Sequence, residues 1–310
     1  MKVLVTGGAG FIGSNIADRL IVEGHEVVIV DDLSTGFREN VHPKATFYRL
    51  DIRDPGLAEI FEKEKPEMVN HHAAQIDVRK SVEDPMFDAQ VNVLGSINLI
   101  QLCAVYGIKK VIYASTGGAI YGEPEYLPAD EHHPIRPLSQ YGITKHIVEH
   151  YLYLYRYNYH LNYTILRYPN VYGPRQDPHG EAGVVAIFTE ALFRGKRPTI
   201  YGDGTHTRDY VFVGDIVEAN LLAMERGDGQ VMNLGWGWEV SVNEIFGTLK
   251  NHLATDIEPL YVPERLGEIH RICLDSTKAQ KELGWKPQVD LDEGIQRTVE
   301  YYSKRQSEAC

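Results

Sequence analysis

The feature that most constrains the fold is a glycine turn set between an apolar strand and an apolar helix near residue 10. Residues 2–32, KVLVTGGAGFIGSNIADRLIVEGHEVVIVDD, predict a strand, a turn, a helix and a second strand. Gly7, Gly10 and Gly13 are spaced GxxGxxG, one residue away from the GxGxxG turn of dinucleotide-binding folds. Such glycines permit a tight turn, close approach of the backbone to a pyrophosphate, and close packing of helix on strand. The pattern therefore predicts a dinucleotide site at the helix N-terminus.

An acidic residue at the end of the second predicted strand narrows the choice of dinucleotide. Asp31 stands where a carboxylate can accept hydrogen bonds from ribose hydroxyls. The next segment, DLSTG (residues 32–36), contains no Arg or Lys that could hold a 2′-phosphate. We therefore expect NAD rather than NADP. The alternative is a purely structural glycine turn in an unrelated α/β protein.

Strand and helix patterns continue to alternate along the chain. Strands are predicted at residues 46–54, 67–75 and 109–116 and within 162–174, and helices at 91–107 and 141–158. The alternation predicts an α/β fold, a Rossmann-type doubly wound parallel sheet with a smaller C-terminal α/β substrate-binding domain. We expect residues 1–172 to form the NAD-binding domain, with residues 209–235 returning to it, and residues 173–310 to form the substrate-binding domain.

Composition excludes several classes of protein. The net charge of −12 argues against a general nucleic-acid binder, which needs a basic face. Three widely spaced cysteines indicate neither a disulfide framework nor a zinc cluster. The sequence contains no run of 18 apolar residues, which a membrane span would need. The apolar segment at its start is too short for a signal peptide. We expect a cytoplasmic protein with no membrane or nucleic-acid partner.

A Tyr–Lys pair and two hydroxyls are the candidate catalytic groups. Tyr141 and Lys145 are four residues apart in YGITK and share one face of a predicted helix. An ammonium beside a phenol favours the phenolate, which can act as a general base. Ser115 and Thr116 end a predicted strand, at the edge where such sheets bind ligands. A YxxxK pattern also arises by chance in helices, and the tyrosines of residues 151–159 are expected to serve packing or a subunit face.

The motifs together resemble the extended short-chain dehydrogenase/reductase family, and most closely its UDP-glucose 4-epimerase branch. They include TGGAGFIGS, DDLSTG, HHAAQIDVRKS, STGGAIYGE, YGITK, RYPNVYGPRQ and GDGTHTRDYVFVGDI, and they span almost the whole chain. The resemblance implies an isomerase that interconverts UDP-galactose and UDP-glucose through a 4-keto intermediate, with NAD retained as cofactor. Tyr141 would take the proton of the 4-hydroxyl, and Lys145 would lower the tyrosine pKa and bind the nicotinamide ribose.

One departure from the family pattern concerns the catalytic hydroxyl. Many members of this branch have Ser or Thr four residues before the Tyr of YG, where this chain has Gly117. We expect Thr116 to take that role, with Ser115 behind it, because two glycines would loosen the backbone and let the Thr116 side chain reach the site. Related dehydratases and decarboxylases carry acids after their hydroxyl, where this chain has Gly117 and Gly118. The absence of these acidic residues favours a reaction limited to oxidation and reduction at C4 of the sugar.

The resemblance also implies the remaining site residues. The expected cofactor contacts are Gly7, Gly10, Phe11, Ile12, Gly13, Asp31, Asp32, Leu33, Ser34, Thr35, Gly36, Asp51, Ile52, His72, Ala73, Ala74, Gln75, Asn92, Ala114, Tyr141, Lys145 and Tyr168. The expected substrate contacts are Thr116, Tyr141, Asn170, Val184, Tyr201, Arg208, Arg265 and Glu268. Ile272 falls near a position that would gate bulky groups at the sugar C2.

Several alternatives stay open at this point. The substrate could be UDP-N-acetylglucosamine or UDP-glucuronate, and the fold could serve a non-catalytic NAD-dependent sensor. No metal is expected, because in the pairs His71-His72 and His132-His133 neighbouring side chains point different ways. By resemblance, the helices at residues 91–106 and 141–158 are expected to pair in a homodimer.

Overall fold

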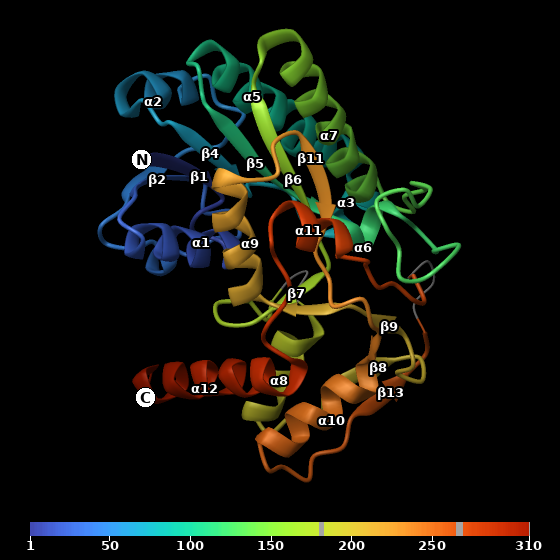
Figure 1. Cartoon of the computed structure of the whole chain (residues 1–310). Coiled ribbons are helices and arrows are strands. Elements are labelled where there is room, and N and C mark those ends of the chain that lie inside the picture. The colour runs from blue at the N-terminus through green and yellow to red at the C-terminus, as the bar shows by residue number, and fades with distance from the viewer. Residues whose placement is uncertain (180–182, 265–268, 310) are drawn as a thin grey trace.

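A large parallel sheet forms the centre of the molecule (Figure 1). The computed structural model describes residues 1–179, 183–264 and 269–309. Within them, seven strands pair in the order β11-β6-β5-β4-β1-β2-β3, and every pairing is parallel. The strands are β1 (Lys2–Thr6), β2 (Glu26–Asp31), β3 (Thr46–Arg49), β4 (Met68–His71), β5 (Lys110–Thr116), β6 (Asn162–Tyr168) and β11 (Gln230–Asn233). The predicted doubly wound α/β fold is confirmed.

Helices cover both faces of this sheet. On one face α1 (Phe11–Val22) packs against α9 (Val213–Glu225), and on the other lie α2 (Leu57–Glu64), α5 (Ser96–Val105) and α7 (Gln140–Tyr159). The apolar stripe predicted for residues 141–158 is buried at Val148 and Leu152. Burial of each such side chain contributes about 1.5–3 kcal/mol. These contacts pack the middle of α7 against β5 and β6.

The strand order also determines where a ligand can bind. Strand β1 lies between β2 and β4, so the chain reverses its direction of winding at β1. In open α/β sheets, ligands bind outside the carboxyl ends of the strands at such a reversal. The glycine turn follows β1 directly, at this edge.

The remaining part of the chain forms smaller units below the sheet in Figure 1. Three strand pairs are present: β7 (Asn170–Tyr172) with β10 (Tyr210–Phe212), β9 (Thr207–Arg208) with β12 (Val240–Ser241), and β8 (Thr199–Tyr201) with β13 (Leu260–Val262). Helices α8 (Val184–Phe193), α10 (Val242–His252) and α12 (Leu291–Ala309) pack around a separate apolar core. Because α9 lies on α1 and β11 pairs with β6, we propose to group residues 209–235 with residues 1–172.

Short elements connect these units. They are η1 (Arg38–Asn40), α3 (Val78–Glu83), α4 (Pro85–Ala89), η2 (Gln90–Gly95), α6 (Gly117–Ile120) and α11 (Thr277–Glu282). In the part of the chain that the structure describes, no helix is both long and apolar enough to span a bilayer.

Two predicted bounds and one predicted helix differ from the structure. Strands β3 and β4 end earlier than predicted, at Arg49 and His71, because the chain turns away where the cofactor edge begins. The helix predicted at residues 91–107 begins as a π-helical turn, η2, and continues as α5. Within η2 the amide of Asn92 exchanges hydrogen bonds with the backbone of Gln75, at 2.8 and 3.0 Å. A π-helical turn of this kind is frequent at functional sites.

Candidate active site

The glycine turn after β1 is too tight for any other residue at two positions. Gly7 has a φ of +69°, and a Cβ there would lie 2.7 Å from the backbone nitrogen of Ala73. A Cβ on Gly13 would lie 2.2 Å from the carbonyl oxygen of Gly7. The first turn of α1 therefore packs directly on the loop, as the approach of a pyrophosphate requires.

The carboxylate at the end of β2 is oriented toward this turn. One oxygen of Asp31 accepts the backbone N–H of Ala9 at 2.9 Å, and the other accepts that of Leu33 at 2.8 Å. Burial raises the pKa of Asp31, and these two hydrogen bonds lower it in part. Each oxygen keeps a further lone pair for a ribose hydroxyl. The residues present therefore fit NAD.

The other predicted cofactor residues lie at or just beyond the carboxyl ends of strands. Asp32, Leu33, Ser34, Thr35 and Gly36 follow β2, Asp51 and Ile52 follow β3, His72, Ala73, Ala74 and Gln75 follow β4, and Ala114 and Tyr168 belong to the ends of β5 and β6. The hydroxyl of Tyr168 accepts from the Asn220 amide at 2.7 Å and lies 3.0 Å from Nε2 of His72. Nδ1 of His72 is buried without a hydrogen-bond partner among the described residues. This orphaned atom also fits a ligand at this edge.

The start of α7 is fixed at its cap and at its close contact with α6. The Ser139 hydroxyl caps the helix by accepting the N–H of Gly142 at 3.2 Å. A Cβ on Gly142 would lie 2.5 Å from the carbonyl oxygen of Ala119, so glycine lets α6 lie directly on α7. Because α6 begins just after Thr116 and α7 just before Tyr141, this contact packs the helix that follows Thr116 against the helix that carries Tyr141.

Lys145 lies one turn after Tyr141 and is buried, with 4% exposure. Its Nζ lies 4.4 Å from the centroid of the Tyr113 ring. Burial lowers the pKa of Lys145 to about 7, although the carboxylates of Glu149 and Asp88 raise it. A negative phenolate one helical turn away would favour the ammonium form of Lys145.

Ser115 is held on the α7 side of the sheet by a buried ion pair. Its hydroxyl donates to Oε1 of Glu149 at 2.6 Å, and Glu149 accepts two hydrogen bonds from the Arg167 guanidinium at 2.6 and 3.0 Å. Burial would raise the pKa of Glu149, but hydrogen bonds from His146, Arg167 and Ser115 hold it at about 2. The Ser115 hydroxyl is therefore engaged within the protein.

Thr116, the last residue of β5, lies beside a small space over Gly118. A Cβ on Gly118 would lie 3.6 Å from Oδ1 of Asn170 and 4.0 Å from Oγ1 of Thr116. The hydroxyl of Thr116 and the amide of Asn170 therefore border the same space. This arrangement supports Thr116, rather than Ser115, as the candidate hydroxyl for a substrate oxygen.

The expectation that two glycines loosen the backbone after Thr116 is wrong. Gly117 and Gly118 begin helix α6. A Cβ on Gly117 would lie 2.3 Å from Cδ1 of Leu274, whose side chain is fully buried. Packing against Leu274 therefore explains why this chain has glycine at position 117.

The predicted substrate residues lie on the smaller units. Asn170 is the first residue of β7, Val184 the first of α8, Tyr201 the last of β8, and Arg208 the last of β9. Nη1 of Arg208 donates to the carbonyl oxygen of Thr207 at 2.8 Å. The predicted contacts Arg265 and Glu268 lie outside the described residues.

Glu149, Asp88 and Asp209 are buried carboxylates that escaped the sequence prediction. Glu149 lies four residues after Lys145, a spacing that could have revealed it. Asp88 accepts from Thr144 at 2.7 Å and so anchors the first turn of α7. Asp209 accepts the backbone N–H groups of Trp236, Gly237 and Leu274 at 3.0 to 3.2 Å, while burial raises its pKa to about 6. Nothing local in the sequence predicts the partners of Asp88 or Asp209.

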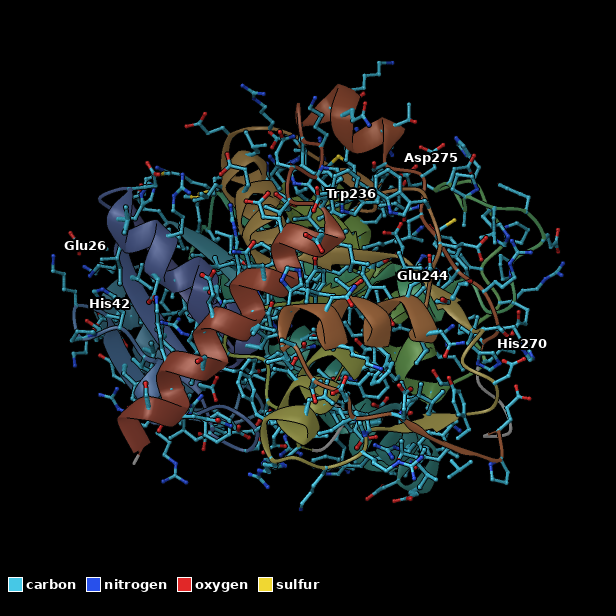
Figure 2. All side chains as sticks on the ribbon, turned by 90° about the horizontal axis from the view of Figure 1, so that it is seen from below. Glu26, His42, Trp236, Glu244, His270 and Asp275 are labelled. Carbon is cyan, nitrogen blue, oxygen red and sulfur yellow. The ribbon has the colours of Figure 1, made fainter. Side chains whose placement is uncertain are left out.

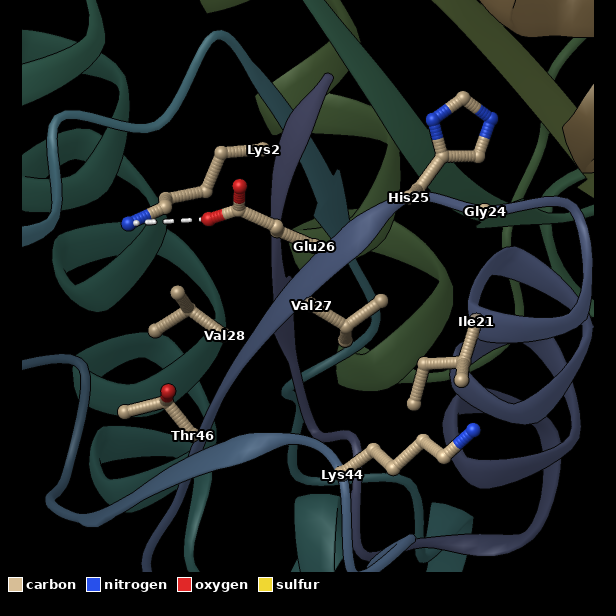
Figure 3. Close-up of a pocket in the computed structure, with 9 residues that line it drawn as sticks. All are labelled: Lys2, Ile21, Gly24, His25, Glu26, Val27, Val28, Lys44 and Thr46. Atoms are coloured by element: carbon tan, nitrogen blue, oxygen red, sulfur yellow. Dashed lines mark ion pairs between the residues drawn. The ribbon is translucent and has the colours of Figure 1, made fainter.

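A separate pocket of about 310 Å³ lies at the opposite edge of the sheet (Figure 3). Lys2, Glu26 and Thr46, which line it, are the first residues of β1, β2 and β3. It therefore lies at the amino ends of the strands, away from the glycine turn.

Comparison with known proteins identifies a matching family. A family model described as the NAD dependent epimerase/dehydratase family matches residues 3–235. The chain belongs to this family. The resemblance to extended short-chain dehydrogenase/reductases and the expectation of NAD are thereby confirmed.

Relatives within the epimerase/dehydratase family match over nearly their full length. The UDP-glucose 4-epimerase of Mycolicibacterium smegmatis is 47% identical over 98% of this chain and 99% of its own. The crystal structure of UDP-glucose 4-epimerase from Thermotoga maritima with UDP-glucose is 51% identical, with a TM-score of 0.97 over 99% of this chain and 100% of that one. The Thermus thermophilus UDP-glucose 4-epimerase in complex with NAD is 46% identical, with a TM-score of 0.94 over 98% and 99%.

Proposed function

We propose that this chain is an NAD-dependent UDP-glucose 4-epimerase that interconverts UDP-galactose and UDP-glucose. The observation that carries the proposal is that the Thr116 hydroxyl and the Asn170 amide border one space over Gly118, on helix α6, which packs against α7. Identities of 46 to 51% to UDP-glucose 4-epimerases across almost the whole chain support the same activity. When bound, NAD supplies reversible oxidation and reduction at C4 of the sugar.

The chain's own residues supply the proton transfer. Tyr141 accepts the proton of the 4-hydroxyl as the 4-keto sugar forms and returns it when the 4-hydroxyl is restored. Thr116 hydrogen-bonds the 4-oxygen and keeps it near the tyrosine. Lys145, through its charge, holds Tyr141 in the form that accepts a proton. Proton removal and return by one group suffices when the sugar is epimerised at C4 alone.

Substrate binding is assigned to residues on the smaller units. Arg208 binds the diphosphate, because a guanidinium fork matches phosphate oxygens. Asn170 binds the sugar or diphosphate beside Gly118, and Tyr201 stacks on the uracil. Val184, Arg265 and Glu268 complete the proposed contacts.

The direct test is turnover of UDP-galactose. Purified protein is incubated with UDP-galactose, with and without added NAD, and UDP-glucose is measured by chromatography beside Tyr141→Phe as the inactive control. We expect UDP-glucose from the wild type in both cases if NAD is retained on purification. No UDP-glucose even with NAD supplied would overturn the galactose assignment and direct attention to UDP-N-acetylglucosamine and UDP-glucuronate.

We propose further that the protein is a homodimer joined through α4, η2 and α7. An apolar groove there is lined by Pro85, Met86, Ala89, Val93, Leu94, Ile143 and Ile147, among others. Met86, Leu94 and Ile143 are 69%, 59% and 46% exposed in the single chain, an arrangement that favours burial against a second copy. Sedimentation should show a dimer at micromolar concentration, and Leu94→Glu with Ile143→Glu should shift it to monomer. A wild-type monomer at that concentration would refute the dimer.

The cytoplasmic location expected from the sequence stays a prediction.

A further inference from the structure

Three side chains beside the proposed substrate residues form a second polar cluster. Nε2 of His206 lies 2.8 Å from Oε1 of Glu264, and Nδ1 of His270 lies 3.8 Å from the same oxygen. The two imidazole rings are 4.7 Å apart and inclined at 72°. One ligand atom from each residue lies within 4.8 Å of the other two.

These separations suit a tetrahedral metal ion. Zn²⁺ binds imidazole nitrogen at about 2.0–2.1 Å and carboxylate oxygen at about 2.0–2.2 Å, which sets neighbouring ligand atoms about 3.4 Å apart. The separations of 2.8 and 3.8 Å lie on either side of that value. Because all three ligand atoms lie within 4.8 Å of one another, side-chain rotations would bring them onto one ion.

The backbone on either side of the cluster is already held in place. The N–H of Thr207 donates to the carbonyl oxygen of His270 at 3.0 Å, which joins the segments of the two histidines. The N–H of His270 donates to the Glu123 carboxylate at 2.8 Å. Glu264 lies just after β13, where Gly202 donates to Val262 at 2.9 Å. The ligand-bearing segments are therefore positioned without the ion.

The cluster is more than an ion pair at the surface. A single carboxylate faces two imidazoles. The side chain of His206 is 16% exposed, and those of Glu264 and His270 lie at the surface, at 48% and 62% exposure. None of the three residues belongs to the proposed catalytic or cofactor set. Figure 2 places His270 at the edge of the C-terminal part, on the opposite side of the molecule from Glu26 and His42. The cluster therefore needs an explanation separate from the catalytic chemistry.

We propose that His206, Glu264 and His270 bind one transition-metal ion of the Zn²⁺ class. Two imidazoles with one carboxylate suit zinc, whereas Ca²⁺ and Mg²⁺ prefer oxygen ligands alone. Three protein ligands leave a fourth position to water. The ion ties β9, which carries Arg208, to the segments of Glu264 and His270. It therefore stabilises the folded state by an amount that rises with the Zn²⁺ concentration relative to the Kd of the site.

The test is metal binding by tag-free protein treated with chelator. Isothermal titration with ZnCl₂ should show one ion per chain, and Co²⁺ should give the visible absorption of a tetrahedral site. Zn²⁺ should also raise the thermal unfolding midpoint. His206→Gln and Glu264→Gln should each weaken Zn²⁺ binding by at least about tenfold.

His252→Gln is the matched control, because His252 pairs with Asp292 at 2.9 Å in a surface ion pair that lacks a second imidazole. It should bind Zn²⁺ like the wild type. Circular dichroism of each variant distinguishes loss of a ligand from misfolding. Failure of the wild type to bind Zn²⁺ at micromolar concentration would overturn the proposal. Equal binding by the folded double variant His206→Gln/His270→Gln would do the same.

Discussion

The carboxyl edge of the large sheet and the small strand pairs below it hold their proposed site residues in different ways. At the sheet edge, buried partners fix each group, as Glu149 and Arg167 do for Ser115. In the smaller units, Asn170, Tyr201 and Arg208 stand on strands of two or three residues, and Tyr201 is 40% exposed. The difference indicates that reaction geometry is built into the core, whereas substrate contacts are added at the surface. Substitutions at the sheet edge should therefore alter turnover or stability, and substitutions below it should alter substrate binding.

The largest effect is expected at Tyr141. Tyr141→Phe removes the group that accepts the proton, and kcat should fall by roughly 10²–10⁴-fold. The control is Tyr153→Phe, on the exposed side of the same helix at 63% exposure, which should keep wild-type kcat. Steady-state kinetics with UDP-galactose measures both. Near-normal kcat in Tyr141→Phe would contradict the assignment of Tyr141 as the general base.

The second effect concerns the buried pair beneath the site. Glu149→Gln leaves the Arg167 charge buried without its partner, so the free energy of unfolding should fall by about 3–5 kcal/mol. Glu258→Gln, which breaks the exposed pair with Lys250, should cost about 0–1 kcal/mol. Urea unfolding measures both changes. Equal losses in the two variants would contradict the contrast between buried and surface pairs.

The same pair predicts a pH dependence. The pKa of Glu149 is about 2 in the folded chain and near 4.5 when unfolded. Because the folded value is the lower one, the stabilisation is present above about pH 4.5 and is lost as the pH falls from there toward 2. The stability difference between wild type and Glu149→Gln should therefore shrink across this window. A difference that stays constant with pH would count against the charge of Glu149 as its source.

The smallest effect on the reaction is expected from substitutions in the smaller units below the sheet. Arg208→Lys keeps the charge but loses the guanidinium fork, so KM for UDP-galactose should rise about tenfold with little change in kcat. Arg197→Lys is the control, because Arg197 also donates to two backbone carbonyls in this part of the chain, those of Glu258 and Pro259. If Arg208→Lys changed kcat rather than KM, substrate binding would not be confined to the smaller units, and the proposed contrast with the sheet edge would fail.

The sequence predicted most accurately the features that depend on residues close to one another in the chain. The glycine turn, Asp31 at the end of β2 and the Tyr–Lys spacing of α7 all depend on neighbours in the chain, and they lie at the same sheet edge. The π-helical turn at Asn92 was not predictable, because its cause is a hydrogen bond to Gln75 in another segment.

The other features that the sequence did not predict also depend on contacts between distant segments of the chain. Gly117 looked like a flexible position, and only the packing of Leu274 from the distant end of the chain shows why glycine is needed. The cluster of His206, Glu264 and His270 joins segments that lie far apart in the sequence, so neighbouring histidine pairs gave no indication of it.

The central claim is that the Ser115 hydroxyl is engaged in a hydrogen bond to the buried Glu149–Arg167 pair, so that Thr116 is the catalytic hydroxyl. The measurement that tests it most directly is kcat for Thr116→Ala and Ser115→Ala with UDP-galactose, with Thr116→Ser as the conservative control. The account predicts that Thr116→Ala loses far more kcat than Ser115→Ala and that Thr116→Ser retains most of it. Loss of kcat in Ser115→Ala with near-normal turnover in Thr116→Ala would contradict it.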